Sequence, residues 1–176
     1  MVHVAQVGNA NEPQSLDSPT AMHATSSSNL WVGGDFSDRG GGGTGAKIHQ
    51  WNGEQWFNRS PTPGPDINTG INDIWVVSDQ EVWAVGQNST VLRTTDGGTN
   101  WEDMDPFAGT VHVQAVSAPA QNFVWITASN GEIRYYDGYE WIQVVPPLGG
   151  GVPFLSVHGS SPAMPGSSAW GNGRST

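Results

Sequence analysis

The stretch Val82–Trp101, VWAVGQNSTVLRTTDGGTNW, decides the fold of this 176-residue chain. It contains two short runs rich in β-branched and aromatic residues, Val82–Gly86 and Val91–Thr94. The second run leads into Asp96-Gly97, a dipeptide that is among the strongest short-range signals for a β-hairpin turn, and then to Trp101. We therefore expect consecutive antiparallel strands joined by tight turns.

The same pattern recurs along the chain, because most of the tryptophans fall into two repeating columns. One column is Trp31, Trp83, Trp125 and Trp170, and the other is Trp56, Trp101 and Trp141. Successive members lie roughly 40 to 50 residues apart, which is the repeat length of a β-propeller blade. We expect an all-β propeller of four-stranded antiparallel blades, with about three and a half blades in this chain.

The repeat also predicts where each blade begins and ends. Complete blades are expected at residues 20–60, 71–106 and 111–146, and a half blade at 152–176 with its first strand over 152–158. Residues 1–19 are expected to form an arm, which could also supply a closing strand. Because an open ring exposes strand edges and apolar surface, we expect self-association or a longer parent chain to complete it.

The tryptophan columns are expected to fill the space between neighbouring blades. A buried tryptophan removes about 150–250 Å² from water, so two columns supply much of the core of a small repeat. On this interpretation Trp83, Trp101, Trp125 and Trp141 are buried. Trp51 and Trp75 lie outside the columns, and we expect them to be more exposed and available to a glycan or a protein partner.

The segment Thr94–Trp101 resembles the Asp box, Ser/Thr-x-Asp-x-Gly-x-Thr-Trp, with Asn100 in the place of the second threonine. Shortened versions that lack the Ser/Thr and the second glycine occur at residues 51–56 and 136–141. Over about residues 20–173 the chain therefore resembles the Asp-box (bacterial neuraminidase) repeat propellers.

The resemblance implies a structural turn made by Thr94, Asp96, Gly98 and Trp101, and it specifies a fold rather than an activity. The physical chemistry of these residue types agrees with that role. The carboxylate of Asp96 can accept backbone N–H groups within its own turn, and glycine tolerates a positive φ.

Composition excludes several classes of function. With 16 acidic and 6 basic residues the formal net charge is −10, which argues against binding to nucleic acid or anionic membranes. The absence of cysteine excludes disulfides, thiolate metal sites and a cysteine nucleophile. The sequence holds no apolar run of about 18 residues, so no membrane insertion is expected. Residues 1–19 lack the features of a signal peptide, and an extracellular or periplasmic location is expected although the composition leaves the compartment undecided.

A search for catalytic groups favours a protein that is not an enzyme. The sialidases among the related propellers need three arginines around the substrate carboxylate, whereas the arginines of this chain are not placed in the inner strands. Asp66, Asp73 and Asp79 flank an inner strand and could form a glycosidase pair, but solvated loop acids are the favoured interpretation. His23, His112 and His158 lie in or near inner strands without a metal-ligand spacing. We expect no catalytic residue, no metal and no cofactor.

The glycine-rich residues 40–47 fail as a phosphate-binding loop, because no Ser or Thr follows Lys47. They fit better as an insertion that lengthens a loop at residues 35–46, with Asp35, Asp38 and Arg39 as candidate binding residues. The function expected is a scaffold or binding module that presents loops to a protein or glycan. The alternatives are a carbohydrate-active hydrolase or a fragment of one, and an assembly factor like the photosystem-assembly propellers.

Overall fold

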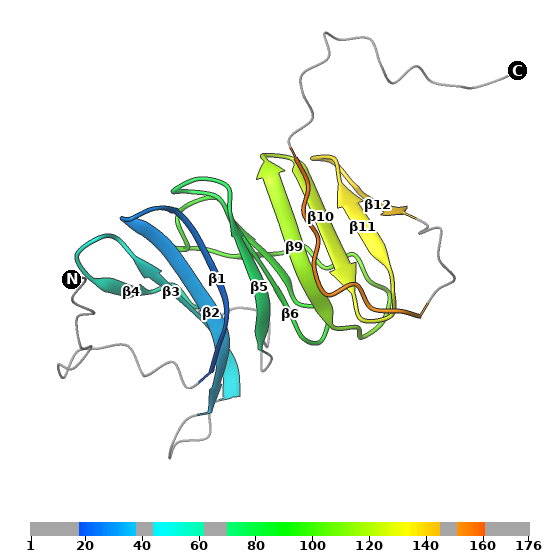
Figure 1. Ribbon diagram of the computed structural model, residues 1–176, viewed down its shortest axis with the longest axis horizontal. Helices are drawn as coiled ribbons and strands as arrows, with labels where there is room; N and C mark the ends of the chain where they lie inside the picture. The colour runs from blue at the N-terminus through cyan, green and yellow to red at the C-terminus, as the bar shows by residue number, and fades with distance from the viewer. Residues whose placement is uncertain (1–17, 38–43, 62–69, 145–150, 161–176) are drawn as a thin grey trace, which may run out of the picture.

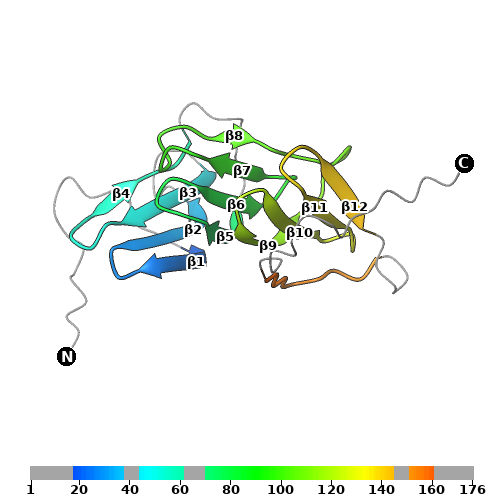
Figure 2. The same ribbon diagram turned by 90° about the horizontal axis from the view of Figure 1, so that it is seen from above.

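The computed structural model of the protein describes residues 18–37, 44–61, 70–144 and 151–160. Throughout these residues the fold is all-β, without a helix, and the strands form three separate four-stranded antiparallel sheets (Figure 1). The expectation of four-stranded antiparallel sheets is therefore confirmed. Figure 2 shows the sheets one after another along the molecule.

Each sheet is a meander in which the strands pair in chain order. The first sheet consists of β1 (Ser18–Ser26), β2 (Asn29–Ser37), β3 (Thr44–Trp51) and β4 (Trp56–Asn58). The second consists of β5 (Ile71–Val76), β6 (Val82–Gly86), β7 (Val91–Thr94) and β8 (Glu102–Asp103). The third consists of β9 (Val113–Ala120), β10 (Phe123–Ala128), β11 (Ile133–Tyr136) and β12 (Trp141–Val144).

Neighbouring sheets pack face to face, and their first strands lie side by side, β1 against β5 and β5 against β9. One apolar cluster fills the space between the first and second sheets, and a second cluster fills the space between the second and third. The alternation of β6 explains this arrangement, since successive side chains of a strand point to opposite faces. Val82 and Ala84 belong to the first cluster, whereas Trp83 and Val85 belong to the second.

The same tryptophan contact joins each neighbouring pair of sheets. Trp31 meets Trp101 edge to face with ring centroids 6.3 Å apart, and Trp83 meets Trp141 in the same way at 6.1 Å. Both Trp31 and Trp83 are fully buried. Such edge-to-face pairs contribute about 0.5–1.5 kcal/mol beyond the apolar area they bury.

The prediction that four column tryptophans are buried is correct for Trp83 and wrong in part for the others. Trp101 and Trp141 are only partly buried, because the ends of the sheets border solvent. Trp125 is half-buried, because no further sheet covers the third one within the described part of the chain.

The turn at residues 94–101 connects the second sheet to the first through a hydrogen bond at its end. The Oγ1 atom of Thr94 accepts the N–H of Gly98 at 2.9 Å, and the carboxylate of Asp96 accepts the N–H groups of Thr99 and Asn100 at 3.0 and 2.8 Å. The hydrogen bonds that the carboxylate accepts lower the pKa of Asp96, and the N–H of Asn100 contributes most. Trp101 then donates its indole N–H to the carbonyl of Arg59 at the end of the first sheet (2.8 Å).

Two sequence-based predictions need correction. Both ends of the loop predicted at residues 35–46 are strand, because β2 continues to Ser37 and pairs with Thr44, the first residue of β3; residues 38–43 lie outside the described residues. The strand predicted at residues 152–158 does not form, since the segment 151–160 pairs with no strand in the described residues. The rest of the predicted half blade and most of the arm at 1–19 lie outside the described residues.

Candidate functional site

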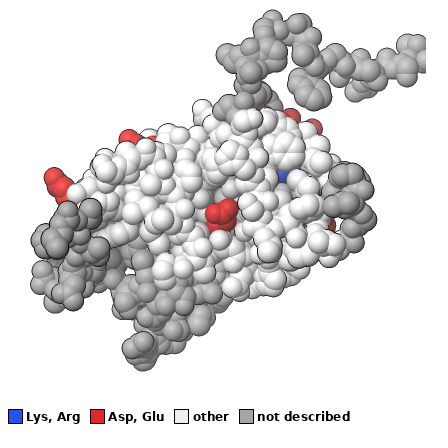
Figure 3. Space-filling model, viewed as in Figure 1, with Lys and Arg blue, Asp and Glu red and all other residues white. Residues whose placement is uncertain are grey.

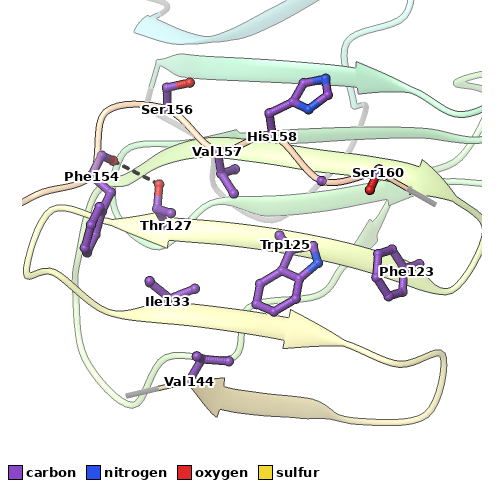
Figure 4. Close-up of a pocket in the computed structure, with 11 residues that line it drawn as sticks. Phe123, Trp125, Thr127, Ile133, Val144, Phe154, Ser156, Val157, His158 and Ser160 are labelled. Atoms are coloured by element: carbon purple, nitrogen blue, oxygen red, sulfur yellow. Dashed lines mark hydrogen bonds between the residues drawn. The ribbon is translucent and has the colours of Figure 1, made fainter. Parts of the chain in front are cut away.

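A groove of about 480 Å³ lies on the outer face of the third sheet, between strands β10–β12 and the segment 151–160 (Figure 4). We call this site the aromatic groove. The sheet contributes Phe123, Trp125, Thr127, Ile133 and Val144, and the segment contributes residues 154 and 156–160. Figure 4 shows the segment crossing β9, so that Trp125 and its neighbours on β10–β12 lie beside it rather than beneath it.

Three aromatic side chains form one cluster at this face. The ring centroid of Trp125 lies 4.9 Å from that of Tyr135 and 6.4 Å from that of Phe123, and the centroids of Phe123 and Tyr135 are 5.2 Å apart. Burial raises the pKa of the Tyr135 phenol, with a smaller contribution from the nearby charge of Asp137. The cluster therefore presents a rigid and largely apolar surface.

This cluster departs from the repeat in a specific way. In the second sheet the residues that correspond to Phe123 and Tyr135 are Glu81 and Arg93, which form an ion pair at 2.8 Å beside Trp83. The third sheet replaces this ion pair with two aromatic rings. The change favours contact with an apolar surface, because no charged pair at this position has to be desolvated.

The segment 151–160 is held against the third sheet by two side-chain hydrogen bonds. Thr127 donates its hydroxyl to the carbonyl of Phe154, and the N–H of Gly159 donates to the hydroxyl of Ser117, both at 2.9 Å. Much of the segment is solvent-exposed, including Leu155 at 75%. The segment thus borders the groove without closing it.

A second hollow, of about 300 Å³, lies where the turns of the first and second sheets meet. Its walls are almost entirely polar and include Asn29, Gln50, Arg59, Asp79 and Asp96. Most of these groups already bond one another: Asn29 donates to Asp79 at 2.8 Å, and Arg59 donates to Gln50 at 3.0 Å. We interpret this hollow as part of the network that joins the two sheets.

The candidate binding residues predicted from sequence do not form one site. The backbone of Asp35 lies in β2, but its side chain, Asp38 and Arg39 are outside the described residues. Trp51 and Trp75 are half-buried rather than freely exposed. Trp75 stacks on His23 with ring centroids 4.6 Å apart, and its edge-to-face contact with His158 has centroids 6.1 Å apart. Trp51 packs against Trp56.

By contrast, the predicted turn residues Thr94, Asp96 and Gly98 are joined by hydrogen bonds, and Trp101 at the end of the turn donates to Arg59 of the first sheet. The cluster that Phe123 and Tyr135 form with Trp125 was not predicted from the sequence. The available signal was their occurrence at repeat positions where the preceding sheet has Glu81 and Arg93.

The inner-strand acids and histidines have structural surroundings. Asp73 accepts the N–H groups of Val116 and Ile74, both at 2.9 Å, while burial raises the pKa of its carboxyl group. Burial also lowers the pKa of His23, whose Nδ1 accepts the N–H of Val76 at 3.2 Å. Within the described residues, no group of three or more His, Asp or Glu side chains is arranged to hold a metal ion.

No protein-family model matches the chain, and a search of curated proteins found no match. In the portion of the chain that the structure covers, no helix has the length and apolar character needed to span a membrane. The face shown in Figure 3 is largely uncharged, with scattered acidic atoms and very little basic charge.

Proposed function

We propose that this chain is a non-enzymatic binding module, built from successive propeller blades, that binds a protein partner through the aromatic groove. The observation that carries the proposal is the half-buried cluster of Trp125, Phe123 and Tyr135 on a sheet face that is covered in the other two repeats. Partly exposed aromatic and apolar surface of this kind is typical of interaction sites.

The contacts between sheets support the propeller part of the proposal. Each sheet packs on the next through its first strand and through the same tryptophan contact. The segment 151–160 continues this pattern, because Gly159 donates to Ser117 as Val76 donates to His23. Ser117 and His23 are equivalent, since each is opposite the column tryptophan of its sheet. Regular placement of this sort is what consecutive blades around one axis require.

The lining of the groove favours a protein over a glycan. On the sheet side, Phe123, Ile133 and Val144 surround Trp125, so few hydrogen-bonding groups are available to sugar hydroxyls there. A hydrolase is less favoured, because Asp73 bonds backbone N–H groups and Asp79 bonds Asn29. An apolar side chain from a protein would gain most from this surface.

Selection from a random peptide library, in parallel with a glycan array, tests the proposal. We expect enrichment of peptides with aromatic or aliphatic side chains, and loss of their binding to a Trp125→Ser variant. Tyr139→Ser is the matched control, since Tyr139 is 94% exposed and does not line the groove. Failure to obtain any peptide that depends on Trp125 would contradict the proposal, and Trp125-dependent glycan binding would replace it. Hydrolysis of aryl glycosides by the purified chain would refute its non-enzymatic part.

A further inference from the structure

We propose that the partner of the aromatic groove is a second copy of this chain, which docks head to tail through the outer face of its first sheet. The inference rests on the proposed function, because it assumes that the groove is a protein-binding surface. It is carried by the contact of a column tryptophan with the next sheet, which recurs inside the molecule and includes a pair of rings between the second and third sheets. Within the described residues, each terminal sheet presents one half of that contact.

The contact between the second and third sheets defines the complete form. Trp83 packs against a pair of rings on the third sheet, and its ring centroid lies 5.8 Å from that of Tyr136 and 6.1 Å from that of Trp141. The ring centroids of the pair are 5.2 Å apart, and the two residues lie opposite each other across β11 and β12. A column tryptophan is thus one half of the contact, and a pair of cross-strand rings is the other half.

Within the described residues, the first sheet carries the ring pair and no tryptophan of another sheet packs against it. Trp51 and Trp56 are opposite each other across β3 and β4, as Tyr136 and Trp141 are across β11 and β12, and their rings lie 5.6 Å apart. Both are half-buried. Met22 of β1 is 70% exposed and faces away from the second sheet, because its neighbour His23 faces that sheet.

In the part of the chain that the structure describes, the third sheet carries the tryptophan and no ring pair of another sheet packs against it. Trp125 on β10 is equivalent to Trp83 on β6. Trp125 pairs with Ser117 on one side and Tyr135 on the other, and Trp83 pairs in the same way with Trp75 and Arg93. The face of Trp125 is the outer one, which borders the aromatic groove. The first and third sheets are at opposite ends of the molecule, so their outer faces point away from each other (Figure 1).

These two faces cannot meet within one molecule, but they can meet between two. The resulting contact joins unlike surfaces, so it can repeat from copy to copy and produce a ring or an open chain. The segment 151–160 lies on the strip over β9 that β1 of the second copy would cover. It forms no strand and is held by the bonds of Thr127 and Ser117, so docking requires it to move aside.

The experiment uses sedimentation velocity on the full chain over a range of concentrations. The wild-type protein should form dimers and larger species as its concentration rises. Trp125→Glu removes one face and Trp56→Glu removes the other, and each variant alone should associate about tenfold more weakly or worse, as expected for a central aromatic residue. Tyr139→Glu serves as the matched control and should behave as wild type.

Mixing the two variants provides the decisive measurement. Each retains one working face, so the mixture should form a one-to-one heterodimer and nothing larger. Circular dichroism and thermal unfolding establish that the variants are folded. If Trp56→Glu does not fold, Met22→Glu tests the same face at an exposed position.

Three results would overturn the inference. A wild-type chain that stays monomeric at every concentration excludes the contact. Dimers of Trp56→Glu at wild-type strength would show that the groove pairs with itself, and a mixture without heterodimer would exclude the head-to-tail arrangement. If self-association is absent while Trp125-dependent peptide binding persists, the inference fails and the proposed function stands.

Discussion

Replacing Gly98 with alanine should destabilise the protein by about 2–5 kcal/mol, because this residue lies where the turn of the second sheet meets the first sheet. Gly98 has a φ of +79°, and a Cβ atom there would lie 2.9 Å from Cη2 of Trp31 and 3.0 Å from Cβ of Arg59. Trp31 is fully buried and cannot move freely to make room.

The magnitude has two parts. A left-handed backbone conformation costs an L-residue about 1–2 kcal/mol. Forcing an extra methyl group into a packed interface typically costs about 1–3 kcal/mol more. The sum is a large fraction of the roughly 5–15 kcal/mol by which a domain is stable.

Two other glycines separate these parts. Gly97 also has a positive φ, +68°, but the nearest atom to its added Cβ would be the carbonyl oxygen of Asp79 at 3.3 Å, so Gly97→Ala should show mainly the backbone cost. At Gly109 no atom lies within 4 Å of the added Cβ, and Gly109→Ala should be close to neutral. The difference between Gly98→Ala and Gly97→Ala measures the steric part.

Unfolding in urea at equilibrium, followed by tryptophan fluorescence, provides the three free energies. If Gly98→Ala is within about 0.5 kcal/mol of Gly97→Ala, the sheets are not in tight contact at this point and the reasoning is refuted. A double-mutant cycle with Trp31→Phe, which removes the clashing ring atoms, should show a coupling of about 1 kcal/mol or more.

Three further predictions concern pH and hydrogen bonding. Because burial lowers the pKa of His23 and of His49 below 6.5, the unfolded state takes up protons first as the pH falls. The free energy of unfolding should then decrease as the pH is lowered from about 6.5, by at most ~1.4 kcal/mol per pH unit for each group. His23→Asn should reduce the dependence of the melting temperature on pH, and an unchanged slope would contradict this. Thr94→Val should cost about 1–3 kcal/mol in urea unfolding, because buried N–H groups lose their acceptor, and a change below 0.5 kcal/mol would argue that the turn finds other acceptors. Thr127→Val should speed hydrogen exchange in the segment 151–160 while leaving the sheets protected, and equal exchange in both proteins would show that this bond does not hold the segment.

Much of the fold could be predicted from local sequence. The apolar run at Val82–Gly86 and the Asp-Gly turn at 96–97 specify their own strands and turn, since strand alternation and turn conformation depend on neighbouring residues. The spacing of Trp31 and Trp83 identified two residues that become fully buried between sheets. The sequence by itself therefore determined most of the strands, their order within each sheet and two centres of the core.

The tertiary structure alone decided which surfaces remain open. Trp125 belongs to the same column as Trp31 and Trp83, yet it is only half-buried, because burial depends on whether another sheet covers it. Residues 152–158 have the pattern of a strand but form none, because a strand needs a partner with which to exchange hydrogen bonds. Strands β2 and β3 stay paired as far as Ser37 and Thr44, through Gly33, Gly34 and Gly45, because pairing across the sheet outweighs local preference. Local sequence patterns specify the strands. The aromatic groove depends instead on which face of the third sheet is covered by another sheet in the described part of the chain.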